Sequence, residues 1–122
     1  MELYNVLKPD FNFEDDRGLL CQLIHDGWKQ TNVLVTKANV VRGVHYHKIS
    51  KEAFYVISGS VNVRFRKGDE TASTHFNKGD FFMVMPGVVH ELSFPTDCVM
   101  VQLYDIPVEN ENGEKDIYVG EI

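Results

Sequence analysis

The sequence predicts an all-β fold, a small barrel or sandwich built from many short strands. Turn signals recur along the chain, for example at Ser58-Gly59, Asn77-Lys78-Gly79-Asp80 and Met85-Pro86-Gly87. The segments between the turns are short and rich in Val, Ile, Phe and Tyr, which favour strands. No window has a helical pattern of useful length. Short strands at regular spacing are typical of β-sandwiches and β-barrels.

Nine strands are expected between these turns. The clearest is 61–66, where Val61, Val63 and Phe65 alternate with polar residues and are therefore expected to face the core. The other strands are less regular but have a similar composition. The expected strands cover residues 19–25, 31–37, 40–47, 53–58, 61–66, 72–76, 81–85, 89–94 and 98–105.

The length of 122 residues fits a single domain that spans residues 1–122. Hydrophobic residues make up 43% of the chain, enough for one core but not for two. The polar residues from about 107 to 122 are expected to form a loose C-terminal arm. Residues 117–119 would end this arm with a short strand that could pair with a partner chain.

The charge balance excludes some classes of partner. The formal net charge is −6, whereas sequence-independent binding to nucleic acid or to an anionic membrane needs clustered Lys and Arg. One anionic small molecule held by one or two local arginines stays compatible with this charge.

The cysteines and the N-terminus bear on the compartment. Cys21 and Cys98 are far apart and belong to no CxxC motif or disulfide framework, so they are expected to be free thiols. No signal peptide is visible at the N-terminus, and the longest apolar run, 81–85, is too short to span a bilayer. A cytoplasmic location is expected.

Three histidines and one glutamate have the spacing of a metal site. His45 and His47 would lie on one face of a strand, and Glu52 follows across a polar stretch that can turn. His90 comes after the Pro-Gly turn, at the start of the next strand. Each residue alone would be unremarkable, as His25 is. Together they could hold a divalent ion such as Zn, Fe, Ni or Mn.

The same residues resemble the two cupin motifs. His45-Tyr46-His47, then four residues, Glu52, six residues and Gly59, is similar to the first motif. Gly79, then five residues and Met85-Pro86-Gly87-Val88-Val89-His90, is similar to the second. The chain departs from the usual pattern at Asn39, Met85 and Phe94, where the motifs often have Gly, Pro and Asn.

This resemblance covers residues of about 40–104, the expected metal-binding core, and it has three implications. The fold would be the cupin double-stranded β-helix, a jelly-roll-like barrel. The metal would lie inside it. The protein would form a homodimer, as cupins frequently do.

Two further segments resemble a narrower group of cupins. Asp15-Asp16-Arg17-Gly18 and Arg42-Gly43-Val44-His45-Tyr46-His47 are similar to the D-x-R-G and R-G-x-H-Y segments of sugar-nucleotide epimerases and ketoisomerases. The cupin domains of capsular polysaccharide biosynthesis proteins are similar too. The resemblance implies that Arg17 and Arg42 bind a nucleotide-linked sugar, with Arg42 beside the metal.

The resemblance also leaves the catalytic role of His45 open. In metal-free relatives the matching histidine is the base, but a metal-bound ring has no free lone pair. Tyr55 and Tyr104 are candidate acids, although strand alternation points Tyr55 away from Glu52.

Three functions therefore stay open. The favoured one is an isomerase or epimerase acting on a nucleotide-linked keto sugar in cell-surface polysaccharide biosynthesis. The alternatives are a metal-dependent small-molecule oxygenase and a non-catalytic module that binds a sugar or metabolite.

Overall fold

The computed structural model describes residues 2–122, and within them it contains only strands, turns and loops. Residues 2–122 include no helix with the length and apolar character that a membrane span requires. The strands are β1 Tyr4–Leu7, β2 Phe11–Asp15, β3 Gly18–Gln22, β4 Gln30–Thr36, β5 Val41–Tyr46, β6 Glu52–Ser58, β7 Ser60–Lys67, β8 Glu70–Asn77, β9 Phe81–Val84, β10 Val89–Ser93, β11 Cys98–Tyr104 and β12 Tyr118–Val119.

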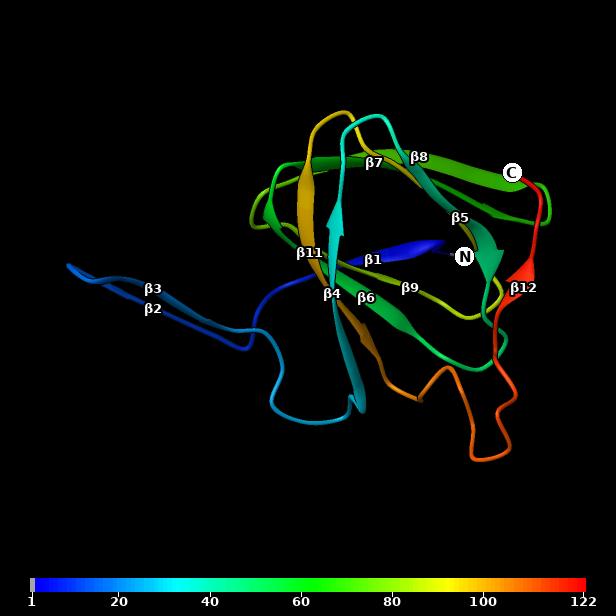
Figure 1. The fold of residues 1–122 in the computed structure, drawn as a ribbon, viewed down its shortest axis with the longest axis horizontal. Helices are drawn as coiled ribbons and strands as arrows, with labels where there is room; N and C mark the ends of the chain where they lie inside the picture. The colour runs from blue at the N-terminus through cyan, green and yellow to red at the C-terminus, as the bar shows by residue number, and fades with distance from the viewer. Residues whose placement is uncertain (1) are drawn as a thin grey trace.

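Two five-stranded antiparallel sheets form the body of the molecule (Figure 1). The first has the order β1-β9-β6-β11-β4 and the second the order β12-β5-β10-β7-β8. Strands that are consecutive in sequence mostly alternate between the sheets, which is the double-stranded β-helix predicted for a cupin. The expected strands from residue 31 onward correspond to β4 through β11, within a few residues at each end.

The main core lies between the two sheets. Val61, Val63 and Phe65 on β7 are at most 1% exposed, as their alternation predicts. Phe54 on β6 and Phe82 on β9 lie opposite each other on neighbouring strands of the first sheet, and their rings stack in this core with centroids 5.2 Å apart. A second, smaller cluster centred on Ala53, Phe81 and Leu103 covers the other side of the first sheet.

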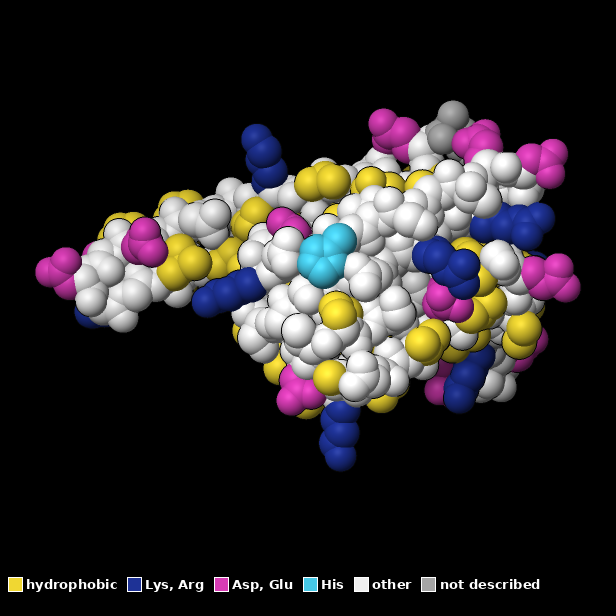
Figure 2. Space-filling model, turned by 90° about the horizontal axis from the view of Figure 1, so that it is seen from above, with side chains coloured by type: hydrophobic (Ala, Val, Ile, Leu, Met, Phe, Trp, Pro, Cys, Tyr) yellow, Lys and Arg dark blue, Asp and Glu magenta, His cyan; other side chains and the backbone are white. Residues whose placement is uncertain are grey.

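The N-terminal part differs from the prediction. The segment 19–25 was expected as one strand, but β3 ends at Gln22 and pairs only with β2. Together β2 and β3 form a hairpin that projects from the body (Figure 1). Phe11, Phe13 and Leu20 share one face of this hairpin and are 48–57% exposed. Figure 2 shows the hydrophobic side chains along this projection.

The C-terminal arm also differs from the prediction, because it packs on its own chain. Strand β12 pairs with β5 of the same chain, with Tyr118 opposite Tyr46 and Val119 opposite His45. Val108 is only 8% exposed, and its N–H donates to the side chain of Gln30. The expected short strand is therefore present, but it pairs within its own chain, and the expectation of a loose arm was wrong.

Both cysteines are free, as expected. Cys98 is buried on β11 and Cys21 is half-buried on β3.

Candidate metal centre and substrate pocket

The four predicted ligands converge on one point between the sheets. His45 lies near the end of β5, His47 directly after it, Glu52 at the start of β6 and His90 on β10. One ligand atom from each residue lies within 4.8 Å of the other three. His47, Glu52 and His90 are at most 2% exposed, and His45 is half-buried.

A β-bulge at Val44 places two functional side chains on the same face of β5. In the ladder with β10, His45 lies opposite His90 and Gly43 lies opposite Glu91, so Val44 is the extra residue. Regular alternation counted back from His45 would turn Arg42 away from the site. The bulge reverses this, and Arg42 instead lies opposite the buried Leu92.

The bulge depends on an unusual backbone. Gly43 has φ +98°, and a Cβ at this position would lie 2.8 Å from the carbonyl oxygen of His90. Val44 has φ +61°, which costs of order 1–3 kcal/mol for a β-branched residue. Asn39, which replaces the usual motif glycine, has φ +67°, and asparagine tolerates this conformation better than most residues. The departure at Asn39 therefore leaves the frame of the motif intact.

Backbone carbonyls orient two of the imidazole rings. His47 Nδ1 is 2.6 Å from the carbonyl oxygen of Asp116, and His90 Nδ1 is 3.1 Å from that of Val88. A carbonyl oxygen can only accept, so each Nδ1 must carry the hydrogen. In a neutral ring, Nε2 then has a free lone pair, and both Nε2 atoms point to the centre of the cluster.

Glu52 fills the remaining side of the cluster. Its Oε1 lies 3.1 Å from His47 Nε2 and 2.9 Å from His90 Nε2. Its Oε2 accepts hydrogen bonds from Tyr104 (2.7 Å) and Gln102 (2.6 Å). One carboxylate oxygen is thus held by strand β11 and the other is directed at the histidines.

Burial and neighbouring charges shift the pKa values of His45, His47 and Glu52. Burial raises the pKa of Glu52, but the nearby charges of His90 and His47 outweigh it, so the pKa is lowered well below its usual range. Burial, and then the charge of His90, lowers the pKa of His45 to about 4. Burial lowers the pKa of His47, yet its contacts with Glu52 and Asp116 raise it on balance. Glu52 is thus ionised and His45 neutral at pH 7.

This donor set fits a divalent cation. When both rings are neutral with the hydrogen on Nδ1, their Nε2 lone pairs face the ionised Oε1 of Glu52, and a bound cation would stabilise this arrangement. His90 Nε2 is buried, and its 2.9 Å approach to Glu52 Oε1 does not have hydrogen-bond geometry, so it has no hydrogen-bond partner among the described residues. An ion at a ligand distance of about 2.1 Å reaches atoms up to about 4.2 Å apart, so small side-chain rotations would gather all four.

A cavity of about 360 Å³ opens onto the cluster. His45, Glu52 and His90 line it, and Arg42 contributes the cationic side chain. Arg42 Nε donates to Thr36 Oγ1 at 2.9 Å. The complete lining is Leu34, Val41, Arg42, Gly43, His45, Glu52, Phe54, His90, Leu92 and Gln102.

The structure separates the two predicted arginines. Arg17 lies at the tip of the β2–β3 hairpin, where its side chain is 85% exposed and pairs with Asp15 at 2.7 Å. It does not line the cavity that Arg42 lines. Tyr55 points away from Glu52, as alternation predicts, and packs against Phe81 on the outer side of the sheet.

The sequence predicts neither Gln102 nor Asp116 as part of the site, and it does not predict that Tyr104 binds Glu52. The sequence indicates Tyr104 only as a candidate acid, but its hydroxyl donates to Glu52. Burial and the charge of Glu52 raise the pKa of this hydroxyl. Gln102 and Asp116 carried no motif signal. For Gln102, the only available hint was that it lies two residues before Tyr104 and therefore on the same face of the strand.

One protein-family model matches most of the chain. The polysaccharide biosynthesis C-terminal domain model matches residues 13–105. No curated protein matches the chain in sequence.

Solved structures share the fold. A doubly substituted QdtA 3,4-ketoisomerase from Thermoanaerobacterium thermosaccharolyticum, solved with TDP, superposes with a TM-score of 0.79 at 23% identity, over 96% of this chain and 87% of that one. The capsular polysaccharide assembling protein CapF from Staphylococcus aureus gives 0.69 at 25% identity, over 97% of this chain and 35% of that one. The RmlC epimerase of Mycobacterium tuberculosis gives 0.71 at 19% identity, over 86% and 64%.

These similarities agree with the resemblance found in the motifs. The structural neighbours are sugar-nucleotide ketoisomerases, CapF and an RmlC epimerase, which all share the cupin-type fold. The chain therefore has a cupin fold and belongs to the polysaccharide biosynthesis C-terminal domain family.

Proposed function

We propose that this protein is a metal-dependent isomerase or epimerase that acts on a nucleotide-linked keto sugar in cell-surface polysaccharide biosynthesis. The observation that carries the proposal is one cavity that joins the His45, His47, Glu52 and His90 cluster to Arg42. A structural neighbour of similar size is a 3,4-ketoisomerase solved with TDP, which supports the substrate class.

The residues of the cavity have separate parts in this proposal. His45, His47, Glu52 and His90 would hold a Zn, Fe, Ni or Mn ion. When bound, such an ion would polarise a substrate carbonyl as a Lewis acid. The Arg42 guanidinium would bind the diphosphate through its fork of N–H donors.

The apolar wall of the cavity supports binding of an organic ligand. Leu34, Phe54 and Leu92 line the cavity and would exclude water from the sugar or the base. The polar groups beside this wall would then fix the orientation of the ligand.

Among the described residues that line the cavity, none is a free base once His45 binds a metal. In a metal-free site, His45 would be the base, but a pKa of about 4 makes it a weak one at neutral pH. The other ionisable residues that line the described cavity are Arg42, Glu52 and His90. This shortage of a free base favours one second candidate, a non-catalytic module that binds a nucleotide sugar.

We also propose that the protein is a cytoplasmic homodimer. The apolar face of the β2–β3 hairpin supports dimerisation, since Phe11, Phe13 and Leu20 are about half exposed. In such a dimer, Arg17 at the hairpin tip would contact a nucleotide sugar bound in the cavity of the other copy, because it does not line the cavity of its own chain.

Metal content is the first test. Protein purified without chelator and without a nickel column should contain about one divalent ion per chain, and His47→Ala should lower this content. Zinc, nickel or manganese without a redox change would fit the proposal. Iron with substrate-dependent oxygen uptake would instead indicate an oxygenase, and unchanged metal content in His47→Ala would contradict the ligand assignment.

Substrate binding is the second test. Thermal-shift measurements with a panel of TDP- and UDP-linked keto sugars should reveal a stabilising ligand. NMR in deuterated water should then show exchange at the carbon next to the keto group. Binding without exchange would indicate the non-catalytic module, whereas no binding by any nucleotide sugar would overturn the proposal.

A further inference from the structure

We infer that Asp116, on the C-terminal arm, is a positioning residue of the metal centre that fixes the ring of His47. This inference rests on the metal site proposed above and goes beyond it. It assigns a role to residues outside the four candidate ligands and outside the cavity.

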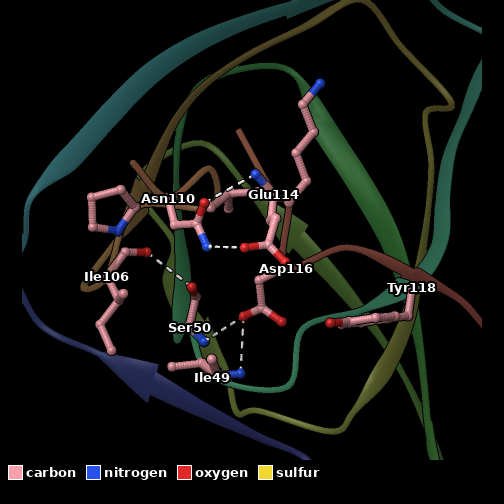
Figure 3. Close-up of a pocket in the computed structure, with 10 residues that line it drawn as sticks. Ile49, Ser50, Ile106, Asn110, Glu114, Asp116 and Tyr118 are labelled. Carbon is pink, nitrogen blue, oxygen red and sulfur yellow. Dashed lines mark hydrogen bonds between the residues drawn. The ribbon is translucent and has the colours of Figure 1, made fainter. Parts of the chain in front are cut away.

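The carboxylate of Asp116 holds the turn between two candidate ligands. It accepts hydrogen bonds from three consecutive N–H groups, those of Lys48 (2.8 Å), Ile49 (2.9 Å) and Ser50 (2.9 Å). Figure 3 shows the bonds to Ile49 and Ser50. This turn connects His47 to Glu52, so its conformation sets the distance between them.

The backbone of Asp116 acts on His47 directly. Its carbonyl oxygen lies 2.6 Å from His47 Nδ1, which fixes the hydrogen on Nδ1 and leaves Nε2 free to face the centre. A partner of this kind on the second ring nitrogen is the usual way in which proteins orient a metal-binding histidine.

Asp116 is itself firmly held. Its N–H donates to the carbonyl of the buried Val108 at 2.9 Å. On its other side, β12 pairs with β5, and the N–H of Gly120 donates to the carbonyl of Val44, the bulged residue. The arm therefore holds both His47 and the bulge that brings Arg42 onto the same face of β5 as His45.

Ser50 links the 48–50 turn, which Asp116 holds, to a second segment of the chain. Its N–H donates to Asp116, and its hydroxyl donates to the carbonyl of Ile106 at 2.9 Å (Figure 3). Ser50 is only 1% exposed. The turn is thus fastened on two sides, and Asp116 supplies all of the side-chain acceptors for the N–H groups of residues 48–50.

The test compares Zn²⁺ affinity, measured by competition with a chromogenic chelator, in four full-length proteins. Asp116→Ala should bind Zn²⁺ about 10- to 100-fold more weakly than wild type, with one site per chain retained. Asp116→Asn should be intermediate, because an amide oxygen can still accept from Ile49 and Ser50 but its NH₂ faces the N–H of Lys48. Glu114→Ala is the matched control on the same arm and should bind within twofold of wild type.

Two further measurements separate the possible causes. The Co²⁺ absorption spectrum should change in Asp116→Ala and stay the same in Glu114→Ala, because only the former alters ligand orientation. In the Zn²⁺-loaded protein, ¹⁵N NMR should show the His47 Nδ1 hydrogen bonded to the Asp116 carbonyl in wild type and a weakened bond in Asp116→Ala.

The outcomes distinguish this inference from the metal site itself. Wild-type protein that binds neither Zn²⁺ nor Co²⁺ would overturn both. Wild-type binding together with unchanged affinity and spectrum in both Asp116 variants would overturn only the role of Asp116. If Asp116→Ala does not fold, Asp116→Asn decides the question on the same readouts.

Discussion

Two arginines, Arg17 and Arg42, come from equally recognisable sequence segments but lie in very different places. Arg42 lines the cavity beside the histidine cluster and donates to Thr36. Arg17 lies at the tip of the projecting β2–β3 hairpin, and its carboxylate partner, Asp15, is two residues away. The fold of the chain thus brings Arg42 to the cavity, whereas the side chain of Arg17 stays in solvent.

The difference shows what determines the position of a binding residue. Arg42 faces the cavity because a bulge at Val44 shifts the alternation of β5, and that bulge is fixed by contacts with β10 and β12. Arg17 is on a two-stranded hairpin that pairs with none of the other described strands. Isolated hairpins are marginally stable at best, so a function for Arg17 requires a surface that supports the hairpin.

Substituting Gly43 should disrupt the bulge that places Arg42 at the cavity, and it should have the largest effect on stability. In Gly43→Ala the new Cβ would contact the His90 carbonyl oxygen, and the backbone at φ +98° would be strained. We expect a loss of about 3–4 kcal/mol in the free energy of unfolding. Chemical denaturation would measure this loss.

The matched control for Gly43 is Gly79→Ala. Gly79 has φ +89°, but a Cβ there has open space around it. This variant therefore measures the backbone strain alone, about 1 kcal/mol. Equal losses in the two variants would mean that the contact with His90, and hence the bulge, contributes nothing.

Removing the Arg42 side chain should weaken ligand binding while the metal stays. Arg42→Ala loses a charged hydrogen-bonding group, so we expect affinity for a TDP-linked sugar to fall about 30- to 100-fold, equivalent to about 2–3 kcal/mol. Calorimetry on metal-loaded protein would measure this. Arg64→Ala, on the outer surface with its partner Glu91, is the control. An Arg42→Ala protein with wild-type affinity would remove Arg42 from the site.

The apolar face of the hairpin that carries Arg17 should contribute to dimerisation. Phe13→Ala truncates a half-exposed aromatic residue opposite Leu20, and we expect dimer dissociation to become about tenfold easier, or about 1–2 kcal/mol. Analytical ultracentrifugation over a concentration series would show it. Leu19→Ala is the control, because Leu19 is similarly exposed on the opposite face. A monomeric wild-type protein would contradict the proposed dimer.

The sequence predicted those parts of the site that depend on local spacing. His45 and His47 are two residues apart on or beside one strand, and Glu52 follows after one turn, so short-range geometry brings them together. His90 was predicted by the spacing of its motif. The core residues Val61, Val63 and Phe65 followed from a period of two.

The parts that were missed depend on contacts between distant segments. Asp116 is 69 residues from His47, and Gln102 is 50 residues from Glu52. Single polar residues of this kind leave no periodicity or spacing to detect. The arm was predicted to be loose because its composition is polar, but its polar groups bind the 48–50 turn instead of solvent. The bulge at Val44 was likewise not visible, because it depends on pairing with β10.

The smallest expected effect is on the pH dependence of the unfolding free energy of the metal-free protein, through His45. Burial and the charge of His90 lower the pKa of His45 from 6.5 to about 4. A lowered folded-state pKa means that the unfolded state takes up the proton first, so the stability present above pH 6.5 is lost as the pH falls toward 4. His47 has the opposite sign, because its raised pKa adds stability below pH 6.5 that is lost as the pH rises.

Substituting His45 isolates its contribution to this pH dependence. His45→Gln cannot be protonated, so the fall in unfolding free energy between pH 7 and pH 4.5 should be smaller than in wild type. We expect a difference of about 1 kcal/mol, because the ring is only partly buried and solvent screens its charge. Urea denaturation of chelator-treated protein at the two pH values would measure it. The same fall in both proteins would mean that His45 is not held neutral beside His90, and the assignment of His45 as a neutral ligand would lose its electrostatic support.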